Sequence, residues 1–377
     1  MKILEPGSPS DLYVGVLSGT SMDGIDAALV RFASRPELLR TFTLPFPSDI
    51  KAGLKALTLP GENEIDSLGR LDVQVGHLFA QAIRGLLEEA AIAPRLVRAI
   101  GSHGQTIRHR PSMTPPFTLQ IGDPNVIAVQ TGIPVVADFR RKDIALGGQG
   151  APLVPAFHEA VFRLTGHDRV VVNIGGIANL TSLPGDSTSH IRGFDTGPGN
   201  ALLDSWCQHT LGTPMDEDGK QAARGRNLPP LLEAFLSDPF FSTPPPKSTG
   251  PEYFSLSWLQ SHLLGKNYEA ADVQATLVRL TAESISAQIE KLPEINHPAI
   301  FLCGGGARNP VLVDCLRARL PQCSIQLTDV LGVAGGWVEA MAFAWLAARY
   351  VNGLPGNCPL VTGASRPAVL GGLYLPD

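Results

Sequence analysis

Residues 12–32 read LYVGVLSGTSMDGIDAALVRF: an apolar run, a turn of small polar residues, and a second apolar run. This pattern predicts two strands joined by a tight connection, and Asp23-Gly24 is a strong hairpin signal. The same order returns in residues 169–183, RVVVNIGGIANLTSL, with Gly175 and Gly176 at the turn. Each turn is either an ordinary hairpin or a site where backbone amides approach an anion, because glycine has no Cβ in the way.

A third glycine-rich turn lies in residues 301–320, FLCGGGARNPVLVDCLRARL. An apolar strand runs into Gly304, Gly305 and Gly306, and an amphipathic helix follows with Asn309-Pro310 near its start. Such a turn can pack against a purine or ribose and offer amides to phosphate, or it can be a plain crossover loop. Neither G-x-G-x-x-G nor G-x-x-x-x-G-K-[ST] occurs in the chain, which argues against the Rossmann and P-loop routes to a nucleotide.

Length and composition exclude several classes of protein. A chain of 377 residues predicts two domains, and 30 Lys+Arg against 35 Asp+Glu gives no basic excess for nucleic acid. The five cysteines form no C-x-x-C pair, so we expect buried thiols in a reducing compartment. The charged, proline-containing N-terminus does not resemble a signal peptide, and no run reaches the ~18 apolar residues of a membrane span. We expect a cytosolic protein without nucleic-acid or membrane partners.

Strand-like and helix-like segments alternate, which predicts an α/β fold. Helices are predicted at 272–292, with Asp272 as a possible cap, and within the apolar stretch 336–351. The proline-rich stretch 237–254 and the C-terminal stretch 356–372 are predicted to be irregular. Short β-branched runs, typical of buried strands, occur at 97–103, 133–139, 169–176, 299–306 and 324–328.

The three glycine-rich turns in this order resemble the actin, Hsp70 and sugar-kinase superfamily, in which two ribonuclease-H-like domains enclose ATP in a cleft between them. A closer resemblance, to the anhydro-N-acetylmuramic acid kinase family of bacterial cell-wall recycling, extends from about residue 13 to the end of the chain. The segments that carry it are 15–26, 99–109, 135–158, 171–181, 192–204, 246–254, 301–310 and 339–347.

The resemblance implies a cytosolic, homodimeric kinase that uses ATP with Mg²⁺. It would open the anhydro ring of 1,6-anhydro-N-acetylmuramic acid with water and phosphorylate O6, giving N-acetylmuramic acid 6-phosphate and ADP. The first duplicated domain, for sugar and phosphate binding, would cover residues 1–167 and 336–377. The second, with the catalytic aspartate and the adenosine site, would cover residues 168–335.

Asp195, in RGFDTGPGN, precedes a Gly-Pro-Gly turn, where a strand end would aim it into the cleft. Ring opening needs a base that deprotonates the water attacking the anomeric carbon while O6 takes the γ-phosphoryl group. Asp195 matches the catalytic aspartate of the family. The competing interpretation is a capping aspartate for a helix that begins near Asn200.

For ATP, the segment GTSMDGID matches the nucleotide-binding segment of the family, with backbone amides and the Thr20 and Ser21 hydroxyls around the phosphates. One of Asp23 and Asp26 could bind Mg²⁺ directly or through water, or Asp23 could simply stabilise the Asp-Gly turn. Many members of the superfamily have a metal-binding aspartate at the start of the second turn, where this chain has Asn173. We therefore leave the metal ligands unassigned. The ATP-binding residues expected are Gly19, Thr20, Ser21, Met22, Asp23, Gly24, Ile25, Asp26, Gly175, Gly176, Gly197, Gly199, Gly304, Gly305, Gly306 and Asn309.

Polar residues that follow two predicted strands are expected to bind the sugar. Arg140 would offer two parallel hydrogen bonds to the lactyl carboxylate of muramic acid. Glu339 is a lone charge on an apolar helix, where it should be paired or functional. His103 can instead be a satisfied core histidine, and Arg141 and Lys142 a solvated face. The full set of expected sugar contacts is His103, Gln105, Thr106, Asp138, Arg140 and Glu339.

Other functions remain open or are excluded by spacing. His158, in HEAVF, lacks the second histidine of a zinc-hydrolase motif, and no G-x-S-x-G elbow is present. A kinase for an ordinary amino sugar remains possible and differs in consuming no water. A nucleotide-gated binding protein of the Hsp70 or actin kind also remains possible, although no peptide-binding or polymerising module is visible in the sequence.

Overall fold

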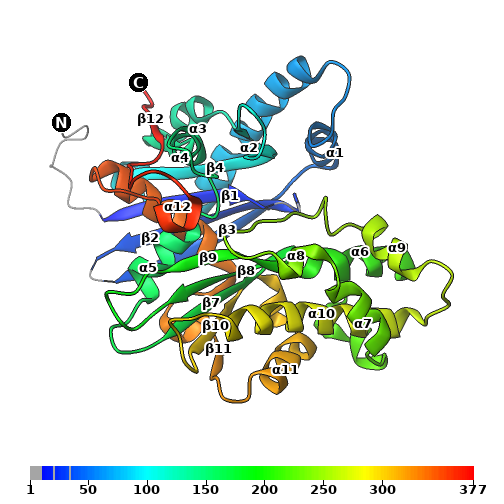
Figure 1. Cartoon of the computed structure of the whole chain (residues 1–377). Coiled ribbons are helices and arrows are strands. Elements are labelled where there is room, and N and C mark those ends of the chain that lie inside the picture. Colours follow the sequence, from blue (N-terminus) through cyan, green and yellow to red (C-terminus); the bar gives the residue numbers. More distant parts are fainter. Residues whose placement is uncertain (1–10, 20–21, 34) are drawn as a thin grey trace. The chain divides into compact units, whose positions relative to one another are not determined.

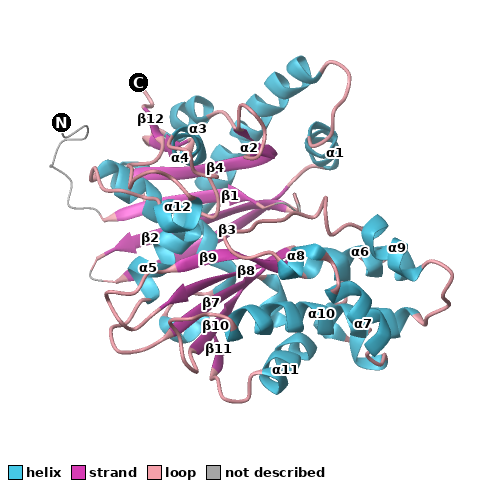
Figure 2. Ribbon diagram, viewed as in Figure 1, coloured by secondary structure: helices cyan, strands magenta, loops and turns pink. Residues whose placement is uncertain are grey.

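The computed structural model describes residues 11–19, 22–33 and 35–377. The chain forms two compact units, unit 1 with Met1–Val161 and Trp337–Asp377, and unit 2 with Phe162–Gly336 (Figure 1). Each unit contains one β-sheet with helices packed on it (Figure 2).

Unit 1 is built on a sheet in the order β12-β6-β4-β1-β2-β3, and β5 pairs with β4 at one side of this path. Its strands are β1 (Leu12–Ser18), β2 (Gly24–Phe32), β3 (Pro36–Pro45), β4 (Ala99–Arg110), β5 (Phe117–Ile121), β6 (Val135–Ala137) and β12 (Gly372–Tyr374). Its helices are α1 (Ser48–Leu57), α2 (Glu64–Ala90), a 3-10 turn (Pro94–Leu96), α3 (Pro124–Thr131), α4 (Phe139–Ala145), α5 (Val154–Phe162, ending at the first residue of unit 2), α12 (Val338–Val351) and α13 (Pro359–Thr362).

Unit 2 is built on a sheet in the order β11-β10-β7-β8-β9. Its strands are β7 (Arg169–Ile174), β8 (Ile177–Leu183), β9 (Arg192–Pro198), β10 (Ala299–Cys303) and β11 (Ile325–Leu327). Its helices are α6 (Asn200–Leu211), α7 (Pro229–Leu236), α8 (Pro239–Ser242), α9 (Leu256–Leu263), α10 (Ala270–Glu290) and α11 (Pro310–Arg319). Short 3-10 turns occur at Glu217–Gly219, Ala222–Arg224, Gly305–Arg308, Thr328–Leu331 and Gly335–Trp337.

The two sheets repeat one topology. In unit 1, β1–β2 and β2–β3 are antiparallel, and β1–β4 and β4–β6 are parallel. In unit 2, β7–β8 and β8–β9 are antiparallel, and β7–β10 and β10–β11 are parallel. The prediction of a duplicated α/β chain with ribonuclease-H-like domains is confirmed.

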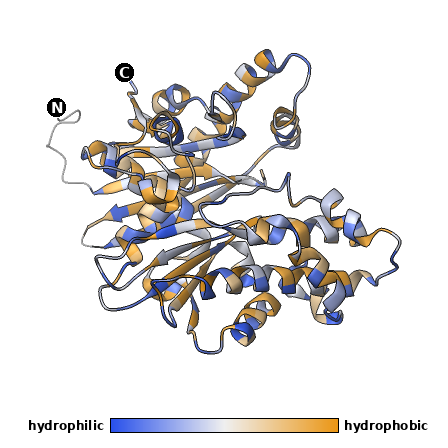
Figure 3. Cartoon of the chain, in the orientation of Figure 1, coloured by the Kyte–Doolittle hydropathy of each residue, from blue (hydrophilic) through white to orange (hydrophobic). Residues whose placement is uncertain are grey.

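Helix α10 shows how the apolar pattern builds the core of unit 2. Its buried side chains recur at helical spacing, Val273, Leu277, Leu280, Ile285 and Ile289 among them, and Figure 3 shows apolar and polar residues alternating along it. The helix begins earlier than predicted, after Glu269. Asp272 is not its cap, because its carboxylate lies in the first turn and accepts a hydrogen bond of 2.7 Å from the Arg226 amide.

The two stretches predicted to be irregular contain short elements. Pro239–Ser242 forms one helical turn, because Asp238 accepts a hydrogen bond from the Phe240 amide and Pro239 needs no amide partner at the first helical position. Pro359–Thr362 forms another turn, and Gly372 begins the edge strand β12, which pairs antiparallel with β6.

The expectation of buried thiols holds for two cysteines. Cys207 and Cys303 are buried, but Cys315, Cys323 and Cys358 are partly exposed; none of the five forms a disulfide in the described residues. Within the part of the chain that the structure describes, no helix combines the length and apolar character that crossing a membrane requires.

Glycines allow α12 to lie against the backbone of β1 and β4. A Cβ at Gly15 would overlap the carbonyl oxygen of Ala340, and a Cβ at Gly101 would overlap that of Phe343. Because those atoms belong to the helix backbone, no side-chain movement can make room for even one methyl group.

We therefore expect Gly15→Ala to lower the free energy of unfolding by about 2–3 kcal/mol, measured by urea denaturation. Gly69→Ala is the matched control, because Gly69 lies on the exposed face of α2 with nothing near its missing Cβ. That change should raise the stability by about 1 kcal/mol through helix propensity. Equal effects of the two substitutions would contradict the close approach.

Candidate functional site

The glycine-rich turns of unit 2 meet at the carboxyl ends of its central strands. The Gly199 amide donates to the Gly176 carbonyl at 2.9 Å, and the Asn200 amide donates to the Gly175 carbonyl at 2.8 Å. Gly304 follows β10, the parallel neighbour of β7, and has φ +80°. A Cβ at Gly304 would overlap the Asn173 side chain at the end of β7. These turns form one glycine-lined surface.

Two of the residues expected to bind ATP, Gly199 and Asn309, have polar groups that already bond within the protein. The amides of Gly199, Asn200 and Ala201 at the start of α6 donate to the carbonyls of the β7–β8 turn. The Asn309 side-chain oxygen accepts from the Val311 and Leu312 amides at 3.1 and 3.3 Å, which caps α11. These hydrogen bonds stabilise the glycine-lined surface, and the groups that form them are not available to a ligand. Gly197, with φ +152°, lies on β9 against Phe241 and Ser284.

Asp195 lies on β9, three residues before the strand ends at Pro198. Its Oδ2 accepts a hydrogen bond of 2.9 Å from the Thr249 amide, and its own amide donates to the Lys247 carbonyl at 3.2 Å. Burial raises the pKa of Asp195 to about 7, against the smaller lowering effects of the Thr249 amide and the Lys247 charge. A carboxylate of this pKa can take a proton at neutral pH, which suits a general base. It does not cap α6, which begins after Gly199 with no side-chain cap.

Sequence reasoning gave no role to Lys247, whose side chain is only 7% exposed. Its Nζ donates to the Phe240 carbonyl at 3.0 Å and lies 4.4 Å from the centre of the Phe240 ring. Burial lowers the pKa of Lys247 to about 8, helped by the charge of Lys291 and opposed by that of Asp195. In the sequence, the only indication that Lys247 matters is its place in PKSTGPEYF, one of the segments that carry the family resemblance.

In unit 1, the expected phosphate turn joins β1 to β2. Thr20 and Ser21 lie outside the described residues. The side chains of Met22 and Ile25 are buried in the core of unit 1, so only their backbones can face a ligand. Gly24 packs against the backbone of Leu44 and Pro45 on β3. Gly19 has open space where its Cβ would be.

The two aspartates of this turn differ in their surroundings. Asp23 is exposed and its carboxylate forms an ion pair of 2.6 Å with Lys51 of α1. Asp26 is half-buried on β2 and accepts a hydrogen bond of 2.7 Å from the Thr43 hydroxyl. Burial raises the pKa of Asp26, and the Thr43 bond opposes this. Lys51 therefore neutralises one of the two charges that would repel a phosphate.

His103 and Arg140 meet across β4 and the segment after β6. The Arg140 Nε donates to the His103 Nε2 at 2.9 Å, and the Arg140 Nη1 donates to the Gly150 carbonyl at 2.8 Å. Burial and the Arg140 charge hold the pKa of His103 well below its ordinary value. The ring is thus neutral with its proton on Nδ1, since that atom lies 3.0 Å from the Gly104 carbonyl oxygen.

Arg140 keeps part of its guanidinium available. Burial lowers its pKa to about 10, so it stays charged at neutral pH, while the carboxylates of Glu339 and Asp143 favour the charge. Its Nε already donates to His103, so a ligand cannot bind the Nε–Nη2 edge of the guanidinium through two hydrogen bonds. Among the described residues, Nη2 has no hydrogen-bond acceptor. The end formed by Nη1 and Nη2 can still bind a planar anion through two hydrogen bonds.

A fully buried carboxylate that the sequence did not single out, Asp143, holds the partner of Arg140. Its Oδ2 accepts from the Gly150 amide at 2.8 Å, and its Oδ1 accepts from the Asn357 side-chain amide and the Thr362 hydroxyl, each at 2.8 Å. Gly150 is thus held at its amide by Asp143 and at its carbonyl by Arg140. The burial of Asp143 is accounted for by these bonds.

Gln105 and Thr106, which were also expected to bind the sugar, do not share these contacts. His103, Gln105 and Thr106 lie within β4, which continues to Arg110, and do not follow it as predicted, because β5 pairs with the second half of the strand. Gln105 is fully buried, and its Oε1 has no partner among the described residues. The Thr106 hydroxyl accepts from Gln120 at 3.1 Å.

Asp138 and Glu339 have different environments. Asp138 forms an ion pair of 2.6 Å with the exposed Arg141. Glu339 lies in the first turn of α12, which begins at Val338, and part of the residue is exposed. Desolvation by the surrounding protein raises the pKa of its carboxyl, opposed by the Arg140 charge and reinforced by that of Asp26. Within the described part of the chain, Glu339 forms no ion pair or hydrogen bond. Glu339, Arg140 and Asp26 are therefore close enough for their charges to interact.

No group of three or more His, Cys, Asp and Glu side chains in the described residues is arranged to hold a metal ion. A magnesium ion that accompanies a nucleotide needs only one or two carboxylates, because phosphate oxygens and water complete its shell. Asp26 offers such a ligand, since its Oδ2 accepts no hydrogen bond from the described residues.

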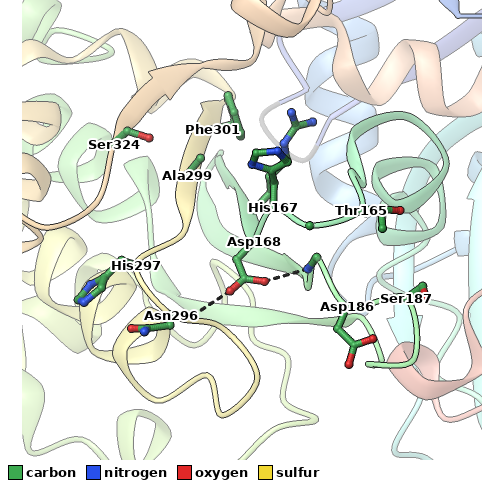
Figure 4. A pocket seen from close by; sticks show the side chains of 13 residues that line it. Thr165, His167, Asp168, Asp186, Ser187, Asn296, His297, Ala299, Phe301 and Ser324 are labelled. Carbon is green, nitrogen blue, oxygen red and sulfur yellow. Dashed lines mark hydrogen bonds between the residues drawn. The ribbon is translucent and has the colours of Figure 1, made fainter.

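A surface pocket of about 740 Å³ lies at the opposite edge of the unit 2 sheet (Figure 4). It is lined by Arg169 and Ala299, which begin β7 and β10, and by the loops around Asp168 and Asp186. Asp168 accepts from the Gly185 and Asn296 amides at 2.8 and 3.1 Å and so joins two of these loops. The glycine-rich turns follow the other ends of the same strands, so this pocket is not part of their surface.

Comparison with known proteins identifies the family. The family model described as anhydro-N-acetylmuramic acid kinase matches residues 11–376. A protein of that name from Shewanella sp. (strain W3-18-1) is 54% identical over 364 residues, 96% of this chain and 98% of that protein. One from Shewanella pealeana is 52% identical over 370 residues, 98% of this chain and all of that protein.

Similarity to solved structures is more distant. A ROK family glucokinase from Streptomyces griseus, in complex with glucose and AMPPNP, is 18% identical with a TM-score of 0.40, over 90% of this chain and 99% of that one. A likeness this weak supports no argument about this chain. The family model and the full-length relatives are sufficient, and the chain belongs to the anhydro-N-acetylmuramic acid kinase family.

Proposed function

We propose that this chain is an ATP-dependent kinase that opens the anhydro ring of 1,6-anhydro-N-acetylmuramic acid with water and phosphorylates O6. The products are N-acetylmuramic acid 6-phosphate and ADP. The observation that carries the proposal is Asp195, a buried carboxylate on β9 whose pKa is raised to about 7, in a chain that the family model matches over residues 11–376.

Asp195 acts as the general base in this proposal. The Thr249 amide holds Oδ2, which leaves Oδ1 to take a proton from the attacking water. The water oxygen bonds to C1 as the C1–O6 bond breaks, and O6 takes the γ-phosphoryl group while ADP leaves. The proton stays on Asp195 until it is released to solvent, so atoms and charge balance.

ATP binding draws on the glycine-rich turns of both units. In unit 2, the Cβ positions of Gly175 and Gly305 have no protein atom closer than 3.5 Å, so these two glycines leave room for a nucleotide, whereas Gly304 and Gly306 pack against the end of β7. In unit 1, the open position at Gly19 and the Lys51–Asp23 ion pair favour phosphate binding. Mg²⁺ would be held by Asp26 and would neutralise charge on the phosphates.

The sugar is bound in part through its carboxylate. The Nη1–Nη2 end of Arg140 supplies two parallel donors for the lactyl carboxylate, in an orientation set by His103 and Gly150. Glu339, near Arg140, would accept a hydrogen bond from a sugar hydroxyl. We further propose a homodimer acting in the cytosol, where ATP is supplied; this part of the proposal rests on the family resemblance.

The first test concerns Asp195. Because the base must be ionised, kcat/KM should fall below a pH of about 7, by roughly tenfold per pH unit once the protonated form dominates. Asp195→Asn should lower kcat by a factor on the order of 10³ at pH 8, since the amide keeps the shape and can still accept from Thr249 but cannot take a proton. Both effects are measured by a coupled ADP assay.

Stability separates loss of the base from loss of the fold. Because the pKa of Asp195 is about 7 in the folded protein and near 4 in the unfolded chain, the free energy of unfolding falls as the pH rises from about 4 to 7. Asp195→Asn lacks this loss and should be no less stable than the parent at pH 8. Asp314→Asn, at an exposed carboxylate of α11, is the control and should change neither activity nor the pH profile. Near-normal turnover by Asp195→Asn would remove Asp195 from the mechanism.

The second test follows the water oxygen. In ¹⁸O-water, the label should appear on the C1 hydroxyl of the product and not on its phosphate, because water attacks C1 and ATP supplies the phosphoryl group. Mass spectrometry before and after enzymatic dephosphorylation locates the label. Unlabelled product kept in ¹⁸O-water for the same time corrects for exchange at C1. Product without label beyond that correction would mean an ordinary sugar kinase.

The third test concerns Arg140. The parent enzyme should prefer anhydro-N-acetylmuramic acid over anhydro-N-acetylglucosamine, which lacks the lactyl group, by roughly a hundredfold in kcat/KM. Arg140→Lys should lose most of this preference, because lysine keeps the charge without the paired donors. Arg141→Lys is the matched control on the exposed neighbour. An unchanged ratio of the two kcat/KM values in Arg140→Lys would assign the carboxylate to another residue.

A further inference from the structure

The segment that contacts Asp195 has an anchor of its own. Asp195 is held at its amide by the Lys247 carbonyl and at its carboxylate by the Thr249 amide, so both bonds come from the irregular stretch after α8. That stretch is neither helix nor strand at Lys247 and Thr249, and no ladder of backbone bonds fixes it. Another contact must therefore hold this segment in place beside β9.

The Lys247 side chain supplies that attachment. It turns back to Phe240 on α8, where Nζ reaches both the carbonyl and the ring face. Phe240 is itself fixed by edge-to-face contacts with Phe241 and Phe254, whose ring centres lie 5.8 and 5.4 Å away. A cation–ring contact is stronger where water is excluded from it, as it is around this lysine. A lysine nine-tenths buried is rare without such partners.

We infer that Lys247 is a positioning residue for Asp195: anchored on Phe240, it fixes the segment whose carbonyl and amide hold Asp195, and it keeps a positive charge beside the carboxylate. The inference rests on the role proposed above for Asp195 as the base. The charged groups that matter are Lys247, whose charge acts on the Asp195 carboxylate, and Lys291 at the end of α10, whose charge acts on Lys247.

The Lys247 charge favours ionised Asp195, so its loss should raise the pKa of Asp195. Protonation of Asp195 weakens the hydrogen bond from the Thr249 amide, so hydrogen exchange at that amide, corrected for its intrinsic pH dependence, reports the ionisation without any substrate. Lys247→Met should lower the protection of Thr249 at pH 8 at least tenfold. It should also move the midpoint of the pH dependence upward by about half a unit or more.

Three control variants separate the effect of the Lys247 charge, the effect of the Phe240 ring and any general loss of stability. Lys247→Arg keeps the charge and should restore the midpoint. Phe240→Leu keeps the carbonyl but loses the ring, and should lower the protection. Lys266→Met removes an exposed lysine that lies 5.9 Å from the Tyr268 ring in the same unit, and should change neither quantity.

The acid limb of kcat/KM should shift with the exchange midpoint in each variant. Lower protection with an unmoved midpoint would mean a merely structural lysine and would overturn the inference, as would unchanged protection in Lys247→Met. If the parent enzyme does not phosphorylate the anhydro sugar, the proposed function fails, and the exchange measurement still decides whether Lys247 positions Asp195.

Discussion

Parallel pairing of the central strands is the constraint on which each unit depends. Because β7 and β10 run in the same direction, the turn after β7 and the turn after β10 meet at one edge of the sheet. The backbones approach so closely there that the Asn173 side chain occupies the space a Cβ of Gly304 would need. In unit 1 the same pairing of β1 with β4 leaves room for α12 only because Gly15 and Gly101 lack side chains.

The groups to which we assign roles in the reaction are held in each unit by partners that do not react. Asp195 is held by an irregular segment anchored through a buried lysine, and Arg140 is held through Gly150 by the buried carboxylate of Asp143. In both places one charged side chain keeps a free end while its other atoms are occupied. Such preorganisation lowers the cost of ordering these groups when the substrate binds.

The raised pKa of Asp195 follows from its place on β9. Burial disfavours the ionised carboxylate more than the Thr249 amide and the Lys247 charge favour it, so the group titrates near neutral pH. Burying that charge destabilises the folded state, and it gives the proposed base a pKa near neutral pH. Asp143 is more deeply buried but carries three hydrogen bonds, and its role is structural.

The sequence by itself determined the duplicated α/β fold and the family, and it singled out Asp195 as the proposed base, because apolar periodicity, turn chemistry and motif order are local properties of the chain. Only the tertiary structure showed that Asn309 caps α11 whereas Asp272 accepts from the Arg226 amide, and that Lys51 pairs with Asp23. It also showed that the buried Lys247 is bonded to the Phe240 carbonyl and the buried Asp143 to the Gly150 amide. Asp143 meets Thr362 across 219 residues of sequence. Burial and such distant partners set the charge and orientation of a polar side chain, and they cannot be predicted from the residues next to it in the sequence.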